Sequence, residues 1–479
     1  MIHKLNRQTA SVSQNRPVKV LQFGKGNFLR GFADWVIDIL NEKTDFNGAV
    51  EIVQSISQGR DSVLNDQDGL YHVILNGIQH GQAFTETRLI TSVIGTFSPS
   101  EDFKRFLETA ENPHLQFIIS NTTEAGIAFD SNDTTIESLA HSFPGKVTQL
   151  LYHRFRHFKG ATDKGLIIIP CELIEKNGDV LKQTILQYID LWNLPEAFKQ
   201  WLLTANTFCN TLVDRIVPGF PKDTIRSVQE QIGFEDNQVV TAEPFHLWVI
   251  EATDAVRAAF PVEKTNLQVK FVKDLTPYRT RKVRILNGAH TALVPVAYLR
   301  GLRTVRESVE DTYAGDFIRK TISEEIIPTL DLPKEELQQF ANDVIERFQN
   351  PFIRHELISI ALNSISKYKV RVLPSVLEYN KRTGKLPERL LFSLAALICF
   401  YKGEVNREII PLNDTPEILA FFKRAWATNN PVQVVKATLC NTALWGQDLT
   451  VIPGLEDKVL HYVLKYQEEL SKDMPVNIL

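Results

Sequence analysis

Three polar side chains, Lys282, Asn287 and His290, interrupt a long apolar stretch that runs from residue 281 to residue 300. At about 100° per residue of an α-helix, they project at roughly 0°, 140° and 80°, and so lie within one half of the helix surface. A buried ammonium, amide or imidazole is costly unless it meets another polar group or a ligand. One such residue is usually a satisfied core position. For three on one face we favour a polar site that opens onto a cleft.

Beside a nucleotide cofactor, these three side chains could catalyse hydride transfer without a metal. In the alcohol direction, a general base must take the hydroxyl proton as the hydride leaves for a nicotinamide. A lysine can do this when burial disfavours its charged form. The Asn287 amide suits the stabilisation of a developing oxyanion, and His290 could orient the substrate or hold Lys282 in place.

A glycine turn near the N-terminus is typical of a dinucleotide-binding unit. Residues 18–23 indicate a buried strand, followed by Gly24-Lys-Gly26-Asn-Phe28-Leu-Arg30-Gly and then by an amphipathic helix from Phe32. Glycines let the backbone approach a pyrophosphate, and a helix N-terminus supplies oriented N–H groups. The usual third glycine is Leu29 here, so this motif alone supports a cofactor loop and an ordinary tight turn about equally.

Further strands follow, and two of them end in polar residues. The second predicted strand, Val50–Ser55, lacks the acidic residue that often binds the ribose of NAD, so the sequence does not decide between NAD and NADP. Residues 68–75 and 88–94 each indicate one more strand. The buried strand Leu115–Ser120 runs into the turn-forming segment 121–126.

The segment after Ser120 is a candidate cofactor contact, because ligands of open α/β sheets lie beyond the carboxyl ends of strands. Thr123 is better explained as a helix cap. Three residues are candidates for the nicotinamide side of a cofactor: Asn121, Thr122 and Glu124.

Other charged patterns give weaker signals. Asp214 and Arg215 are adjacent in an apolar segment, where a structural ion pair and an Asp214 that faces a cleft are equally supported. His153 and His157 have metal-compatible spacing, but with no third ligand nearby a solvated basic face is favoured. The four cysteines are scattered and indicate neither a zinc site nor a disulfide framework. We therefore predict no metal.

These residues must be positioned by two domains, because 479 residues exceed what one core usually holds. Strand and helix patterns alternate up to residue 276, and helical periodicity dominates after Pro277. We predict a Rossmann-like α/β domain over residues 1–276 and a mainly α-helical domain over residues 277–479. The later helices are expected at Asp311–Glu325, Lys334–Phe348, Arg354–Lys367, Pro387–Tyr401, Pro416–Ala427 and Leu455–Leu470.

Whole-chain composition excludes several classes of partner. The formal charge of −4 gives no reason to expect nucleic acid or an anionic membrane. The first residues have no apolar signal core, and no apolar run approaches membrane-spanning length. A reduced cytoplasm fits best, and the oligomeric state stays open.

The spacing Lys282-x4-Asn287-x2-His290 resembles the signature of the polyol-specific long-chain dehydrogenase/reductase family, the mannitol dehydrogenase group. Further similar segments follow in the family's order: Gly24-x-Gly26-x-Phe28-x-Arg30, Asn121–Gly126, Val213–Pro218 and Arg347-Phe-x-Asn-Pro351. The resemblance implies a Rossmann-like and a helical domain, and NAD(H) or NADP(H) chemistry without metal. It assigns Lys282 the role of general acid/base, Asn287 that of oxyanion donor and His290 that of substrate contact.

Within this family, three segments resemble the branch that acts on hexuronic acids: Ser120–Ile127, Ile169–Leu173 and Lys282–Val296. The resemblance implies an NAD-linked interconversion of D-tagaturonate and D-altronate. The alternatives are the sister activity on fructuronate and mannonate, or oxidation of a hexitol. Where mannitol-type members have Cys-Asp-Asn, this chain has Cys171-Glu-Leu173, and leucine cannot donate to an oxyanion. Arg279 likewise replaces an acidic residue of the family.

A sugar-acid substrate carries a carboxylate that needs a cation. Arg354 and Lys367 are candidates because both follow the Asn350-Pro351 motif, although a solvated helix face explains either residue nearly as well. Asp214 is a further candidate substrate contact. A nucleotide-sensing protein without catalysis is the alternative class, and the presence of Lys282, Asn287 and His290 argues against it.

Overall fold

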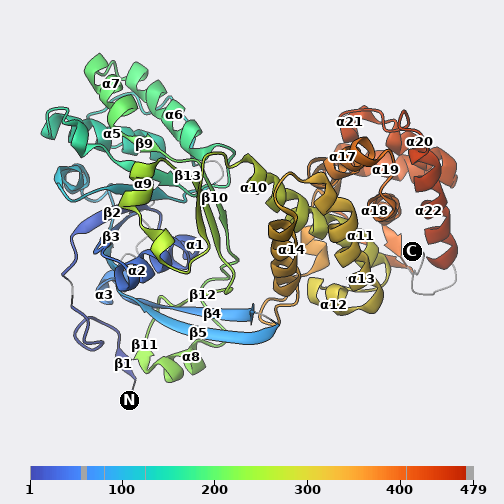
Figure 1. Ribbon diagram of the computed structural model, residues 1–479, viewed down its shortest axis with the longest axis horizontal. Helices are drawn as coiled ribbons and strands as arrows, with labels where there is room; N and C mark the ends of the chain where they lie inside the picture. Colours follow the sequence, from blue (N-terminus) through green and yellow to red (C-terminus); the bar gives the residue numbers. More distant parts are fainter. Residues whose placement is uncertain are drawn as a thin grey trace. The chain divides into compact units, whose positions relative to one another are not determined.

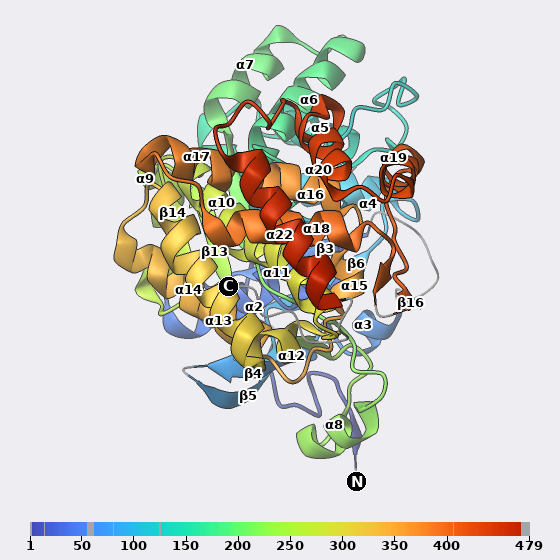
Figure 2. The ribbon, with the colours of Figure 1, turned by 90° about the vertical axis from the view of Figure 1, so that its right-hand side faces the viewer.

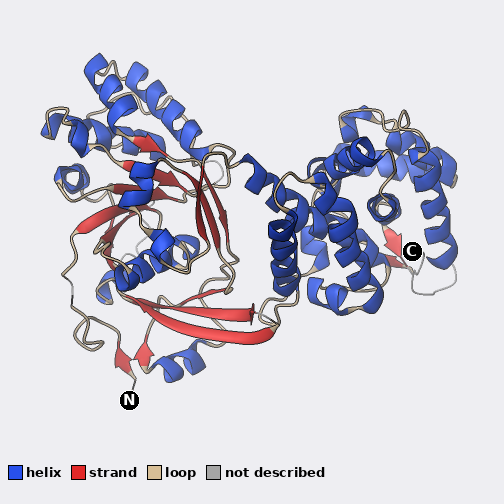
Figure 3. Ribbon diagram, in the orientation of Figure 1, coloured by secondary structure: helices blue, strands red, loops and turns tan. Residues whose placement is uncertain are grey.

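The structure, a computed structural model, describes residues 2–13, 15–54, 62–79, 81–123, 126–405 and 407–470. The chain divides into two compact units. Unit 1 comprises Met1–Gly77 and Ala83–Leu275, and unit 2 comprises Ile78–Gln82 and Thr276–Leu479. Unit 1 carries most of the strands, whereas unit 2 is almost entirely helical (Figure 3).

Unit 1 (Figure 1) is built on a six-stranded parallel sheet. The strand order of this sheet is β6-β3-β2-β7-β8-β9. This is the doubly wound order, in which the direction of strand addition reverses between β2 and β7. Ligands of such sheets bind in the crevice at that reversal, beyond the carboxyl ends of the two strands. The strands are β2 (Val18–Phe23), β3 (Ala49–Val53), β6 (Val93–Phe97), β7 (Phe117–Ser120), β8 (Ile167–Pro170) and β9 (Thr207–Phe208).

Helices cover both faces of this sheet because successive strand residues point to opposite sides. Val20 of β2 packs in one core with the apolar side of α2 (Ala33–Lys43). Leu21 packs in a second core with α5 (Phe143–His157) and α6 (Asn177–Leu191). The short apolar strands predicted from the sequence therefore contribute to both cores.

The rest of unit 1 consists of small sheets and short helices. The order β12-β4-β5 forms one three-stranded sheet, β10-β13-β14 forms another, and β1 pairs with β11. The bounds are β1 (His3–Lys4), β4 (Tyr71–Gln79), β5 (Gln82–Ile90), β10 (Thr211–Asp214), β11 (Phe234–Glu235), β12 (Val240–Ala242), β13 (Leu247–Glu251), β14 (Val269–Val272), α1 (Asn27–Arg30), α3 (Ser62–Asp66), α4 (Phe103–Glu108), α7 (Glu196–Ala205), α8 (Ile225–Ile232), α9 (Asp254–Ala259), and the 3₁₀ turns η1 (Thr109–Glu111), η2 (Thr162–Lys164) and η3 (Val262–Lys264).

One predicted strand of unit 1 is wrong. The sequence indicated a single strand over residues 88–94, but β5 ends at Ile90 and β6 begins at Val93. Between them, the backbone N–H groups of Thr91 and Ser92 donate to the carboxylate of Asp38, at 2.8 and 3.1 Å. The Asp38 carboxylate thus takes the place of the strand carbonyls to which these two N–H groups would otherwise donate. The chain leaves the sheet of β5 here and enters the six-stranded sheet at β6.

Unit 2 surrounds the buried helix α11 (Ala289–Leu299), which packs on α18 (Glu388–Phe400). The Ser393 hydroxyl on α18 donates to the Ala292 carbonyl at 2.9 Å. Helix α22 (Leu455–Leu470) packs across α18 and also contacts α20 (Pro431–Leu439) (Figure 2). The other elements are α10 (Thr276–Arg281), α12 (Val305–Glu310), α13 (Thr312–Lys320), η6 (Ile327–Thr329), α14 (Lys334–Phe348), α15 (Leu357–Ile360), α16 (Ser364–Arg371), α17 (Leu373–Thr383), β15 (Glu404–Val405), β16 (Glu408–Ile409), α19 (Pro416–Ala427), α20 (Pro431–Leu439) and α21 (Thr442–Trp445).

Two helical predictions need correction. Lys282–Gly288 is a π-helix, η4, and a second π-helix, η5 (Thr321–Ile326), extends α13. The predicted helix over residues 354–367 is two helices, α15 and α16, because Asn363 adopts a left-handed conformation with φ of 53° before α16. No helix in the described residues is long and apolar enough to cross a membrane.

Candidate active site

The predicted catalytic residues lie on and just after the π-helix η4. Lys282 begins η4, Asn287 is near its end, and His290 is in the first turn of α11. All three are partly exposed. The π-helical hydrogen-bonding pattern spans one residue more than that of an α-helix, so the angles expected from α-helical geometry do not apply between residues 282 and 288. Such segments frequently occur at functional sites.

Helix η4 is held against the C-terminal end of α16. The Arg284 guanidinium donates to the carbonyls of Val370 and Arg371, at 2.7 and 3.3 Å, and so satisfies carbonyl groups at a helix end. Gly288 lies so close that a Cβ atom there would stand 3.1 Å from the Arg371 carbonyl oxygen. The π-helix therefore has a fixed neighbour, and this neighbour carries Lys367.

Of the two predicted substrate cations, Lys367 is partly buried and Arg354 is not. The Lys367 ammonium donates to the Ile360 carbonyl at 2.9 Å, and burial lowers the pKa of Lys367. The Arg354 side chain is 81% exposed and forms an ion pair with Glu356 at 2.5 Å. Lys367 lies on α16, which contacts η4, and a contact of either residue with a substrate carboxylate stays a prediction.

Aromatic contacts orient His290. Its ring stacks on Phe348 of α14, with centroids 4.0 Å apart and an interplanar angle of 13°. A second ring neighbour is His355, whose ring meets it edge-on at 5.2 Å, and burial lowers the pKa of His355. Phe348 belongs to the Arg347-Phe-x-Asn-Pro segment, so that segment fixes an imidazole of the predicted site.

In unit 1, the glycine turn and the loop after β7 meet at the strand-order reversal. Gly24 has φ of 113°, its N–H donates to the Val53 carbonyl at 3.1 Å, and a Cβ atom at Gly24 would lie 3.0 Å from the Asn121 carbonyl oxygen. Only glycine is comfortable in this position. At Gly26, by contrast, a Cβ atom would meet nothing within 4 Å beyond its own chain neighbours. The open space over an exposed backbone fits the pyrophosphate of a dinucleotide.

Arg30 and Phe28, both predicted cofactor residues, contact other parts of unit 1. The buried Arg30 guanidinium donates to the carbonyls of Lys25 and Gln238, at 3.1 and 2.6 Å, and burial lowers its pKa. Phe28 stacks on Phe32 with centroids 4.9 Å apart. Arg30 thus holds the glycine turn in shape, and a direct contact of either side chain with a cofactor stays a prediction.

Close to the glycine turn lies a buried carboxyl group that the sequence analysis did not single out. Asp34 accepts from the Tyr71 hydroxyl at 2.9 Å and from the Gln22 amide at 3.4 Å. The same Gln22 amide donates to the Gly24 carbonyl at 3.1 Å. Burial raises the pKa of Asp34 to about 7. The sequence signal for this site was an aspartate on the apolar side of the amphipathic helix that begins near Phe32.

The predicted nicotinamide-side residues are tied to the next strand. The Asn121 amide donates to the Cys171 carbonyl at 2.6 Å, and the backbone N–H of Thr122 donates to the Glu172 carboxylate at 3.0 Å. Glu124 lies outside the described residues. Sequence reasoning missed Glu172, although an acidic residue two positions after the apolar strand Ile167–Pro170 was a weak signal. Leu173, which follows it, is 63% exposed.

Asp214 ends β10 and is buried, and its role as a substrate contact stays a prediction. The neighbouring Arg215 guanidinium donates to the carbonyls of Glu243 and Gly31, both at 2.9 Å, and lies over the Trp35 ring. Gln54, at the predicted ribose position, is buried, and its amide donates to the Thr96 hydroxyl at 2.9 Å. The adjacent Ser55 lies outside the described residues.

Two further features involve none of these residues. His153 and His157 both contact the Glu111 carboxylate, at 2.8 and 3.5 Å, so the two imidazoles share one acidic partner. No group of three or more ligand side chains suited to a metal ion occurs in the described part of the chain.

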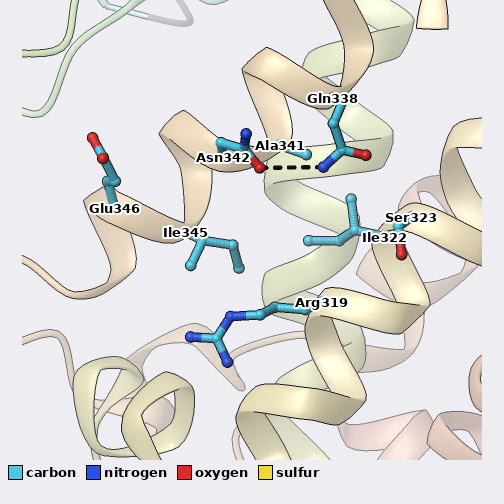
Figure 4. Close-up of a pocket in the computed structure, with 8 residues that line it drawn as sticks. All are labelled: Arg319, Ile322, Ser323, Gln338, Ala341, Asn342, Ile345 and Glu346. Carbon is cyan, nitrogen blue, oxygen red and sulfur yellow. Dashed lines mark hydrogen bonds between the residues drawn. The ribbon is translucent and has the colours of Figure 1, made fainter. Parts of the chain in front are cut away.

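A pocket in unit 2 combines apolar and polar side chains from α13, η5 and α14 (Figure 4). It is lined by Arg319, Ile322, Ser323, Gln338, Ala341, Asn342, Ile345 and Glu346.

Comparison with solved structures gives the same fold. A D-sorbitol dehydrogenase in substrate-free form superposes with a TM-score of 0.81 at 21% sequence identity, over the full length of both chains. The Pseudomonas fluorescens mannitol 2-dehydrogenase, solved as a ternary complex with NAD and D-mannitol, gives a TM-score of 0.67 at 21% identity over 98% of each chain. The predicted fold class, a Rossmann-like domain followed by a helical domain, is confirmed.

Sequence comparison is more specific. Residues 18–264 match the mannitol dehydrogenase Rossmann domain, and residues 274–467 match the mannitol dehydrogenase C-terminal domain. The altronate oxidoreductase of Phocaeicola vulgatus is 51% identical over 94% of each chain. That of Bacillus subtilis is 48% identical over 96% of this chain and 95% of its own. The resemblance expected from the motifs is thereby confirmed, and the chain belongs to the mannitol dehydrogenase family.

Proposed function

We propose that the protein is an NAD-dependent oxidoreductase that interconverts D-tagaturonate and D-altronate. The observation that carries this proposal is the 46–51% identity to several altronate oxidoreductases over more than nine-tenths of the chain. A second support is that Lys282, Asn287 and His290 gather on η4 and the first turn of α11. The protein is accordingly a dehydrogenase or reductase that acts on a secondary alcohol or its ketone.

Unit 1 would hold the dinucleotide at the crevice between β2 and β7. The open backbone at Gly26 fits the pyrophosphate, and the loop of Asn121 and Thr122 would border the nicotinamide. When bound, NAD supplies the hydride acceptor, and NADH the hydride donor. The Pseudomonas fluorescens relative, which was solved with NAD, supports this choice of cofactor.

Lys282 would act as the general acid/base. In the direction of ketone reduction, its Nζ atom delivers a proton to the oxygen that becomes the new hydroxyl group, and in the reverse direction Nζ takes that proton away. The Asn287 amide would donate a hydrogen bond to the same oxygen while its negative charge develops. His290, fixed by Phe348, would hold a neighbouring substrate hydroxyl.

The substrate carboxylate would be held by Lys367. This residue lies on α16, which contacts η4, and its ammonium is already oriented by the Ile360 carbonyl. A fixed cation on the element next to the general acid/base would select sugar acids over uncharged ketoses of the same length.

The direct test is to follow NADH oxidation by the purified protein with D-tagaturonate, D-fructuronate and D-fructose in parallel, and then to repeat the series with NADPH. We expect kcat/KM to be highest for D-tagaturonate with NADH. A clear preference for D-fructuronate would move the activity to the sister reaction on mannonate. Tight NADH binding without turnover of any keto sugar would instead indicate a nucleotide-sensing protein.

A further inference from the structure

The loop after β7 is fastened to the end of β8 by one carboxylate. Glu172, only 3% exposed, accepts from the Ser120 hydroxyl at 3.0 Å on one oxygen. On its other oxygen it accepts from the backbone N–H and the hydroxyl of Thr122, at 3.0 and 3.1 Å. All three donors belong to residues at the strand-order reversal, where a dinucleotide binds in this type of sheet.

The backbone that carries Glu172 is itself fixed. The Asn177 amide donates to the carbonyls of Glu172 and Pro170, at 3.1 and 3.0 Å. The two loops are also joined directly, since the Cys171 N–H donates to the Ser120 carbonyl at 2.7 Å. The backbone on either side of Glu172 is therefore fixed, and this limits the positions that its carboxylate can take.

Fold stability alone gives a poor reason for this carboxylate. Burial raises the pKa of Glu172, which means that its ionised form is desolvated, and no ion pair with a cation of the described residues offsets that cost. An apolar side chain would avoid this desolvation cost but would leave the Ser120 hydroxyl and the two Thr122 donors without their acceptor. The side-chain hydrogen bonds of Glu172 come instead from Ser120, at the end of β7, and from Thr122, in the loop that follows. A buried acceptor with these partners is suited to fixing the start of that loop in one conformation.

We infer that Glu172 is a positioning residue for the cofactor: it holds Ser120 and Thr122 so that the start of the loop after β7, residues 121–123, is already shaped for the nicotinamide end of the dinucleotide. This inference rests on the proposed function. It assigns Glu172 no contact with substrate or cofactor. Its effect is to reduce the ordering that the loop undergoes when NADH binds.

The test measures NADH binding and backbone amide hydrogen exchange in the wild-type protein, Glu172→Ala, Thr122→Val and the double variant. We expect Glu172→Ala to raise the Kd for NADH about 10-fold or more and to speed exchange at the Thr122 amide in the cofactor-free protein. Glu172→Gln, which can still accept from Thr122 and donate to the Ser120 hydroxyl, should restore most of both properties. The double variant should bind little worse than Glu172→Ala, because Glu172→Ala already removes the hydroxyl contact that Thr122→Val removes.

Glu325 provides a matched control. It is another glutamate that is 3% exposed, and it accepts from the backbone N–H groups of Arg389 and Leu390, both at 2.9 Å, at the start of α18. Glu325→Ala should lower Tm but leave NADH affinity and Thr122 exchange unchanged. Equal NADH binding by wild type and Glu172→Ala would overturn the inference, and so would an equal loss of NADH affinity in Glu325→Ala. Failure of the wild type to bind NADH would overturn the proposed function instead.

Discussion

At the scale of single residues, Lys367 and Arg354 carry the same charge but differ in burial and in the group that each side chain contacts. Both follow the Asn350-Pro351 motif, and nothing in the local pattern favours one over the other. Arg354 is solvated and paired with Glu356, so binding a carboxylate would require it to exchange one anion for another. Lys367 is partly buried, and its ammonium donates to an uncharged carbonyl. A carboxylate ligand would therefore gain more from Lys367.

We expect Lys367→Gln to raise the KM for D-tagaturonate by about 10-fold or more, because a charge-assisted hydrogen bond to the carboxylate is lost. The matched variant Arg354→Gln should change this KM less than about threefold. Steady-state kinetics with D-tagaturonate and with an uncharged ketose would check both. The assignment is wrong if Lys367→Gln weakens both substrates equally, or if Arg354→Gln has the larger effect on the acid.

Asp34 predicts a pH dependence of stability. Burial raises the pKa of its carboxyl group from 3.8 to about 7, so the folded protein binds this proton more tightly than the unfolded chain does. The resulting stabilisation is fully present below about pH 4 and is lost as the pH rises through about 7. The expected loss in the free energy of unfolding is on the order of a few kcal/mol.

Asp34→Asn should remove this dependence, because an amide stays neutral and its oxygen can still accept from the Tyr71 hydroxyl. Wild-type Tm should fall relative to that of the variant between pH 5 and pH 8, and calorimetry at several pH values would measure the difference. A constant difference in Tm across this range would mean that Asp34 does not titrate there.

At the scale of elements, the glycine turn contains one position where a side chain would be crowded, Gly24, and one where it would meet open space, Gly26. Gly24→Ala places a methyl group 3.0 Å from the Asn121 carbonyl oxygen at a positive φ, so we expect it to lower the free energy of unfolding by about 1–3 kcal/mol. Gly26→Ala meets nothing within 4 Å beyond its chain neighbours and should leave Tm nearly unchanged. It should nevertheless raise the Kd for NADH at least about 10-fold, because its methyl group takes space proposed for the pyrophosphate.

Thermal unfolding and NADH titration of both variants would separate these effects. If Gly26→Ala bound NADH as tightly as the wild type, the dinucleotide could not lie over this backbone. A large loss of Tm in Gly26→Ala would mean that the turn is less open than its surroundings indicate.

The same elements show where sequence patterns suffice and where they do not. The buried strand Val18–Phe23 and the helices Lys334–Phe348 and Pro416–Ala427 follow from local periodicity, and they were predicted within a residue of their bounds. The π-helix η4 was not, because the apolar spacing of residues 281–300 fits an ordinary helix equally well. Glu172 was missed for a related reason: its partners are about fifty residues away, and one acidic residue after a strand is only a weak signal by itself.

At the scale of the whole molecule, the proposed reaction assigns cofactor binding to unit 1 and proton transfer to Lys282 of unit 2. A variant that has lost proton transfer should therefore still bind NADH. We expect Lys282→Ala to lower kcat by about 100-fold or more, because general acid/base catalysis is lost, while the Kd for NADH stays close to that of the wild type.

Stabilisation by the cofactor provides the check that does not depend on turnover. NADH at about 100 times its Kd should stabilise the folded state by about 2.7 kcal/mol, and this gain should appear as the same rise in Tm in the wild type and in Lys282→Ala. Gly26→Ala, with a Kd raised about 10-fold, should gain only about 1.4 kcal/mol at the same NADH concentration, and so show a smaller rise in Tm. If Lys282→Ala lost both turnover and the NADH-dependent rise in Tm, Lys282 would be needed for binding, and the general acid/base role would have to pass to another residue. If Lys282→Ala kept wild-type turnover, the proposed mechanism would be wrong regardless of how NADH binds.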